Sequence, residues 1–172
     1  PGTRRKIILH EEDGRQYIES RQDVGDLVKY AGALRDNPEV NGKDDTAHRL
    51  SAKGRARADR IGSLFTRAEL PNGLYRPQVL VASQGTSSSR RMSETLTPLA
   101  EALHLSMDTS IDAEAAISGM AKLLTTRASS GVVLACLEHS AIVGVAKALG
   151  KSTPAVPGNW PDDRFDTFWV FV

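Results

Sequence analysis

The sequence predicts an α/β fold: a three-layer α/β/α sandwich with a mostly parallel central sheet. Short apolar runs alternate along the chain with amphipathic segments of helical period, which is the order of strand–helix–strand units. The run over residues 132–137 is apolar throughout, as expected of a parallel strand that is covered on both faces. Right-handed crossovers between such strands place helices on both sides of the sheet.

The composition is that of one globular domain, so residues 1–172 are expected to form a single unit. Its 22 Lys and Arg nearly balance its 21 Asp and Glu. The chain therefore lacks the bulk positive charge of a protein that binds nucleic acid, and no nucleic-acid partner is expected. No apolar stretch reaches the ~18 residues of a membrane-spanning helix, and no signal-peptide pattern is present, so we expect a cytoplasmic protein without a membrane partner. The single cysteine, Cys136, is expected to be a buried core residue.

The first half of the chain predicts two strands and two helices. Residues 6–9 form an apolar run and a first strand, and residues 11–50 form a long polar insertion with ten Asp and Glu. Within it, residues 24–34 carry apolar side chains at helical spacing and are expected to form a helix. Ser51 is a suitable N-cap for a helix that reaches about Arg67. Residues 71–73 (Pro-Asn-Gly) break the chain before a second strand over 79–82.

The second half continues the alternation. A helix follows the polar run 83–89, with apolar residues on one stripe over 92–103, and Pro98 inside it predicts a kink or a late start. Asp112 is expected to cap a helix that ends near Ser129. A third strand spans 132–137, and a helix over 140–149 is stopped by Gly150. The chain ends with a strand over 165–172.

The ends of the strands carry the residues most able to do chemistry. In open parallel sheets, ligands bind outside the carboxyl ends of the strands, where helix N-termini direct free N–H groups outward. The first strand ends at His10, the second leads to Arg90 and Arg91, and the third ends at Glu138 and His139. Two imidazoles and a pair of guanidinium groups are therefore expected to converge on one edge. His48 and His104 have no such place and are interpreted as surface residues.

This set of side chains suits an anionic tetrahedral substrate. A guanidinium group binds two oxygens at once, a neutral imidazole can attack phosphorus, and a protonated imidazole stabilises the charge that develops. The same groups could also act as an acid and base on a carbonyl or carboxylate substrate. We therefore expect a small anionic substrate, with Arg90, Glu11, Ser83 and Ser140 as further contacts.

Four segments resemble the histidine phosphatase (phosphoglycerate mutase-like) superfamily. Residues 50–58 resemble its helix-opening signature, and residues 83–95 its arginine motif. Residues 133–139 resemble the strand of its second histidine, and residues 161–169 the ending of a small subgroup. The resemblance implies a phosphoglycerate mutase-like fold and a phosphoric monoester hydrolase that works through a phosphohistidine. It implies His10 as nucleophile and Arg91 and His139 in the phosphate pocket.

The first motif departs from the family pattern. The family opens with Arg-His-Gly-Glu, whereas this chain has Leu9-His10-Glu11-Glu12. The exchange to Leu9 removes a phosphate-binding guanidinium, a loss on the order of 2 to 5 kcal/mol. Glu11 adds a carboxylate where the backbone of the family approaches the ligand.

Three interpretations are compatible with this departure. Another arginine could supply the missing contact and keep phosphatase activity, and the candidates are Arg5, Arg15, Arg21 and Arg90. Alternatively, His10, His139 and a nearby glutamate act as acid and base in non-phosphoryl chemistry. A third interpretation is a catalytically inactive binding module.

A carboxylic acid must protonate the leaving oxygen in the first interpretation. The candidates are Glu12, Asp13, Asp112 and Glu114, and Glu12 is preferred for its position beside His10. No metal site is expected, because adjacent ligands at residues 10–13 cannot easily converge on one ion. No organic cofactor is expected either.

Overall fold

The computed structural model describes the backbone of residues 4–9, 18–23 and 28–31. It describes backbone and side chains of residues 49–50, 52–71, 73–84, 90–150, 156–160 and 168–171, the side chain of Lys53 excepted. The strands are β1 (Arg4–Leu9), β2 (Ile18–Asp23), β3 (Val28–Ala31), β4 (Val79–Ala82), β5 (Met107–Asp108), β6 (Val133–Cys136) and β7 (Phe168–Phe171). The helices are α1 (Ala52–Phe65), α2 (Arg91–Leu103), α3 (Ile117–Ala128) and α4 (His139–Leu149).

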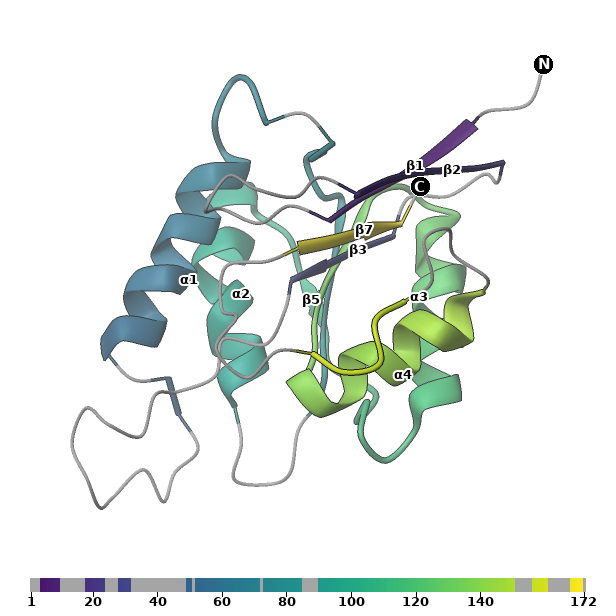
Figure 1. Cartoon of the computed structure of the whole chain (residues 1–172). Coiled ribbons are helices and arrows are strands. Elements are labelled where there is room, and N and C mark those ends of the chain that lie inside the picture. Colours follow the sequence, from purple (N-terminus) through teal and green to yellow (C-terminus); the bar gives the residue numbers. More distant parts are fainter. Residues whose placement is uncertain are drawn as a thin grey trace.

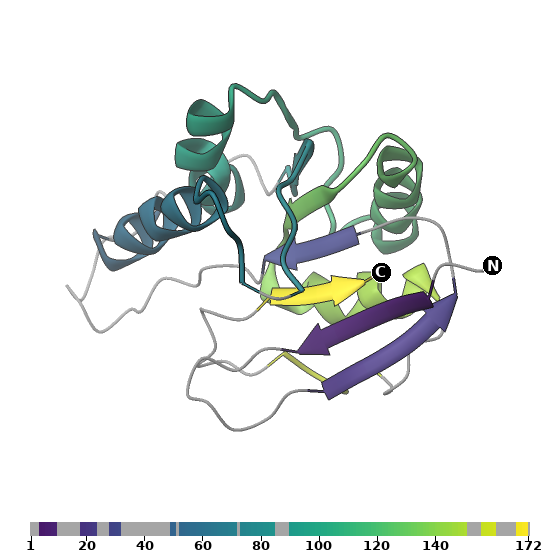
Figure 2. The same ribbon diagram turned by 90° about the horizontal axis from the view of Figure 1, so that it is seen from above.

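Seven strands form one sheet in the order β2-β1-β7-β3-β6-β4-β5. The strands β3, β6, β4 and β5 are mutually parallel, and we call them the parallel half. The strands β2, β1 and β7 pair antiparallel with their neighbours and form the antiparallel half. Figure 2 shows β1, β2 and β7 together at one side of the sheet.

Helices cover both faces of the sheet, which confirms the predicted three-layer architecture. In Figure 1, α1 and α2 lie on one side of the sheet and α3 and α4 on the other. Leu80, Leu134 and Cys136 pack on the side of α1 and α2, whereas Val81 and Ala135 pack with α3 and α4. The central strands are apolar on both faces for this reason, and Cys136 is buried as expected.

Close helix packing depends on small residues at two crossing points. A Cβ on Gly144 of α4 would lie 2.6 Å from the Cδ1 of Ile117 in α3. On the other face, a Cβ on Gly62 of α1 would lie 3.4 Å from the backbone of α2. The start of α1 is held to α2 by Glu94, whose Oε2 accepts a hydrogen bond from the backbone N–H of Leu50 at 2.9 Å.

Two expectations about secondary structure were wrong, and of the kink or late start expected at Pro98 the late start was wrong. The predicted helix over 24–34 contains the strand β3 instead, because residues 28–31 pair with both β6 and β7 in the middle of the sheet. Tertiary pairing here overrides the helical spacing of the apolar residues. The helix α2 begins at Arg91 and continues through Pro98, so it does not start late. Asp112 caps a separate turn before α3, which itself begins at Ile117.

The other predicted elements agree with the structure. The strands β4, β6 and β7 lie within the predicted ranges, and α1 and α4 differ from the expected boundaries by no more than two residues among those described. Gly150, with φ of 141°, ends α4. No helix within the described ranges is long and apolar enough to cross a membrane.

Candidate functional site

The carboxyl ends of three parallel strands lie at one level and define the candidate site. Cys136, the last residue of β6, is in register with Ala31 of β3 and Ala82 of β4. The residues that come after these strands therefore meet along one edge, which we call the carboxyl edge. The helices α2 and α4 follow β4 and β6, so both begin at the carboxyl edge with their positive dipole ends.

Arg91 is the first residue of α2 and is half-buried, while Arg90 before it is exposed. The backbone of Arg91 is fixed, since the hydroxyl of the buried Thr95 donates a hydrogen bond to its carbonyl at 2.8 Å. Its guanidinium group forms no hydrogen bond or ion pair with another described residue. A half-buried guanidinium at a helix N-terminus is a suitable anion ligand.

His139 is the first residue of α4 and follows β6 after only two residues. It is half-buried. The preceding residue, Glu138, is extended and its carbonyl begins the helix by accepting hydrogen bonds from Ala141 and Ile142 at 2.9 and 3.1 Å. The short connection between two rigid elements holds His139 at the carboxyl edge.

Ser83 directly follows β4 and is 2% exposed. Its hydroxyl accepts a hydrogen bond from the backbone N–H of Ala113 at 2.9 Å and donates one to the carboxylate of Glu138. Its backbone N–H donates to Cys136 at 2.9 Å. Ser83 was expected to contact substrate, but in this structure its polar groups bind other parts of the protein.

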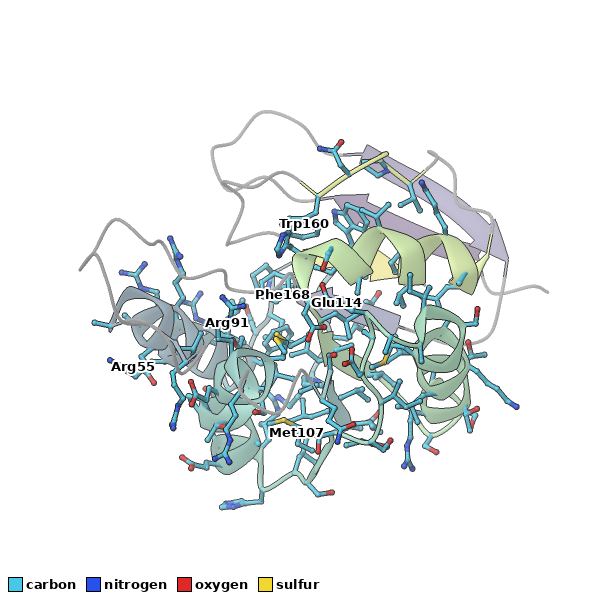
Figure 3. The ribbon with its side chains drawn as sticks, turned by 90° about the horizontal axis from the view of Figure 1, so that it is seen from below. Arg55, Arg91, Met107, Glu114, Trp160 and Phe168 are labelled. Atoms are coloured by element: carbon cyan, nitrogen blue, oxygen red, sulfur yellow. The ribbon has the colours of Figure 1, made fainter. Side chains whose placement is uncertain are left out.

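Ser140 is exposed on the first turn of α4, and its hydroxyl donates a short hydrogen bond to the carboxylate of Glu114. The carboxylate of Asp112 accepts hydrogen bonds from the backbone N–H groups of Glu114 and Ala115 at 2.9 and 3.2 Å. Figure 3 shows Arg91 and Glu114 on either side of Phe168 in a view from below. The site thus has a basic side at α2 and an acidic side at the turn over 112–115.

Glu138 is a site residue that the sequence analysis missed as a candidate for chemistry. Burial raises the pKa of its carboxyl group above the ordinary value. The hydrogen bond from Ser83 opposes this shift, while the negative charges of Glu114 and Asp112 raise the pKa further. Its position directly before His139 at a strand end was the available signal.

The predicted residues His10, Glu11 and Glu12 lie outside the described residues, as do Asp13 and His48. The strand that leads to His10 is β1, which ends at Leu9. Two strands, β7 and β3, lie between β1 and β6. At about 4.8 Å per strand, the axes of β1 and β6 are about 14 Å apart.

The neighbour of β6 on this side of the sheet is β3, which the sequence analysis did not identify as a strand. Tyr30 and Ala31 occupy its carboxyl end, in register with Ala135 and Cys136. The signal that could have found it is the spacing of Val28 and Tyr30, two strand-forming residues two positions apart.

The arginines considered as substitutes for the missing guanidinium are spread over the sheet. Arg5 lies four residues before the end of β1, about 13 Å along the strand, and Arg21 pairs with Lys6 within the β1–β2 hairpin. Arg15 lies outside the described residues. Arg90 is the one candidate among the described residues that lies beside Arg91 at the carboxyl edge.

His104, interpreted as a surface residue, is exposed and ends α2 in the left-handed conformation with φ of 54°. No group of three or more His, Cys, Asp and Glu within the described ranges could hold a metal ion.

Comparisons with known proteins identify the fold. No protein-family model and no curated protein sequence matches the chain. Among solved structures, SixA from Agrobacterium tumefaciens, assigned as a phosphohistidine phosphatase, is similar with a TM-score of 0.51 and 17% sequence identity. The match covers 71% of this chain and 75% of SixA. The chain has a phosphoglycerate mutase-like fold.

Two further structures match with lower scores. Mycobacterial hydrolase 1 has a TM-score of 0.48 at 12% identity, covering 73% of this chain and 78% of that one. The mycobacterial glucosyl-3-phosphoglycerate phosphatase Rv2419c has a TM-score of 0.45 at 14% identity, covering 72% and 77%.

Proposed function

We propose that the carboxyl edge binds the phosphate group of a small phosphorylated substrate and that the chain is a phosphoric monoester hydrolase of the histidine phosphatase type. The observation that carries the proposal is the position of Arg91 and His139. Each is the first residue of a helix, and the two helices follow neighbouring parallel strands. A guanidinium, an imidazole and two helix N-termini together favour a dianionic phosphate.

In the proposed reaction, the imidazole of His10 attacks phosphorus as the bond to the ester oxygen breaks. Arg91 binds the non-bridging oxygens and His139 donates a hydrogen bond to them, so that both stabilise the transition state. Water then attacks the phosphohistidine, the bond between nitrogen and phosphorus breaks, and inorganic phosphate leaves. The role of His10 rests on the sequence resemblance, and the likeness to SixA supports phosphoryl chemistry on this fold.

A second candidate function is phosphate binding without turnover. The order of the sheet favours it, because β7 and β3 separate β1 from β6. If the imidazole of His10 stays on the far side of these two strands, it does not reach a phosphate group that is held at α2 and α4. Arg91 and His139 would then bind an anion that no histidine attacks.

Phosphoenzyme trapping separates these functions. The protein is incubated with a ³²P-labelled aryl phosphate, quenched, and tested for an acid-labile, base-stable label of the phosphohistidine type. Label on wild-type protein that is lost in His10→Ala supports the hydrolase. The matched control is His104→Asn, which replaces an exposed histidine by a residue that tolerates its positive φ and is expected to keep the label.

Calorimetry with orthophosphate and orthovanadate supplies the other outcomes. Binding of either anion without label or turnover would favour the phosphate-binding protein. An absence of both binding and turnover would reject both candidates and favour non-phosphoryl chemistry at the same edge.

A further inference from the structure

Glu138 occupies a fixed position between β6 and α4. Leu137, which is fully buried, precedes it, and its own carbonyl accepts the first hydrogen bonds of α4. The backbone therefore cannot move without disturbing a central strand or a helix. The carboxyl group of Glu138 lies at the carboxyl edge, because it is hydrogen-bonded to Ser83, the residue that follows β4.

The carboxyl group of Glu138 is only half satisfied. It accepts a hydrogen bond from the hydroxyl of Ser83, but its Oε2 is buried and has no hydrogen-bond partner. A buried carboxylate oxygen without a partner is unfavourable, and such a group in a native protein requires an explanation, of which a catalytic role is one. In the protonated acid, an O–H on Oε2 would be a donor that still needs an acceptor.

The surroundings favour that protonated form. The groups that face Glu138 are the hydroxyl of Ser83 at the end of β4 and the carboxylates of Asp112 and Glu114 in the turn before α3. Burial and the two negative charges raise the pKa of Glu138, and they outweigh the opposing hydrogen bonds from the hydroxyl of Ser83 and from the backbone of Glu138 itself. A proton donor that works near neutral pH needs a shift in this direction.

We propose that Glu138 is the general acid of the hydrolysis, a role that rests on the proposed function of this site. As the bond between phosphorus and the ester oxygen breaks, the proton on the carboxyl group of Glu138 passes to that oxygen, which leaves as a neutral alcohol. In the second half of the reaction, the carboxylate takes a proton from the water that attacks the phosphohistidine. Glu138 is then protonated again for the next cycle.

The other carboxylates of the edge are less suited to this step. The carboxylate of Asp112 already accepts hydrogen bonds from two backbone N–H groups. Glu114 is exposed and accepts the hydroxyl of Ser140. Glu138 is the carboxyl group among these three that has a buried oxygen without a partner.

The test compares two substrates with different leaving groups. 4-Nitrophenyl phosphate releases a weakly basic phenolate that needs little protonation, whereas an alkyl phosphate releases a strongly basic alkoxide that needs a general acid. Glu138→Gln keeps the size of the side chain and removes the proton. We expect it to lower kcat/KM for the alkyl phosphate by about 100-fold or more and to change kcat/KM for 4-nitrophenyl phosphate by less than about 10-fold.

Three further variants serve as controls for the test. Glu101→Gln makes the same exchange at an exposed position on α2 and is expected to leave both activities unchanged. Glu114→Gln removes a negative charge that raises the pKa of Glu138, so the basic limb of the pH profile for the alkyl phosphate should move to lower pH. If Glu138→Gln does not fold, Glu138→Asp replaces it in the test, because it retains a carboxylic acid. A shorter acid should lower kcat/KM for the alkyl phosphate more than kcat/KM for 4-nitrophenyl phosphate, whereas a purely structural role would lower both equally.

The outcomes separate the inference from the function on which it rests. Suppose that wild-type protein hydrolyses both esters, and that Glu138→Gln lowers the two kcat/KM values equally or leaves both unchanged. Glu138 is then not the general acid, and the hydrolase proposal stands. If wild-type protein hydrolyses neither ester, the proposed function fails and the role of Glu138 fails with it.

Discussion

The parallel and antiparallel halves of the sheet differ in the elements to which their strands lead. In the parallel half, β4 and β6 lead to helices that begin at the carboxyl edge, and these helices place Arg91 and His139 there. In the antiparallel half, β1 pairs with β2, the next strand of the chain, instead of leading into a helix. Within the described part of the chain, the helix N-termini at this edge therefore follow parallel strands, and an anion is expected to bind on their side.

This contrast separates two parts of the proposed chemistry. The proposed phosphate-binding groups belong to the parallel half, whose strand β6 is buried on both faces. The proposed nucleophile follows a strand of the antiparallel half, with β7 and β3 between it and β6. Binding and turnover consequently depend on different halves of the sheet, and variants can test each one alone.

The largest effect is expected at Arg91, the cation of the parallel half. Arg91→Ala removes a half-buried guanidinium and should weaken kcat/KM or phosphate affinity by about 2 to 4 kcal/mol, or roughly 30- to 1000-fold. Arg91→Lys keeps the charge but not the two-pronged contact, so it should recover only part of the loss. The control is Arg60→Ala, an exposed arginine of α1. Equal behaviour of the Arg91 and Arg60 variants would show that the anion does not bind at α2.

The second prediction asks whether the two halves fold together. Leu134 in β6 is fully buried, and Leu134→Ala should lower the free energy of unfolding by about 2 to 5 kcal/mol. Val170 in β7 is 2% exposed, and Val170→Ala should lower it by about 1.5 to 2.5 kcal/mol. Urea unfolding followed by circular dichroism should show one transition in both variants. A separate early transition in Val170→Ala alone would mean that the antiparallel half unfolds independently.

The smallest effect is expected from the charge of Glu138 on stability. Because its pKa is raised in the folded state, its contribution to stability is fully present below the ordinary value of 4.5 and is lost as the pH rises through the folded pKa. Glu138→Gln cannot ionise, so it should be more stable than wild type at pH 8 and closer to wild type near pH 4.5. Urea midpoints at the two pH values give the measurement. A constant difference between the proteins would contradict the raised pKa.

Much of the parallel half could be predicted from the sequence because its signals are local. The apolar runs of β4 and β6 and the helical stripes of α2 and α4 each depend on a few consecutive residues. The rule for parallel sheets then places Arg91 and His139 at one edge.

The strand β3 of the parallel half and the order of the strands in the sheet could not be predicted in the same way. Residues 24–34, which include β3, carry apolar side chains at helical spacing. Residues 28–31 form a strand because they pair with β6 and β7, which lie more than 100 positions away in the sequence. The two strands between β1 and β6 also set the distance from one to the other, which no local pattern encodes. The hydrogen-bond partners of Ser83 could not be predicted either, since they depend on how the turn at Ala113 packs against the end of β4.

The two tryptophans of the chain, Trp160 and Trp169, lie with ring centroids 5.0 Å apart and are 5% and 4% exposed. The indole fluorescence of the chain therefore originates from one buried site that includes Trp169 of β7. Its emission wavelength reports on water reaching the C-terminal segment, without any label being attached. A red shift on unfolding, or its early onset in a variant, would track that segment alone while circular dichroism tracks the helices.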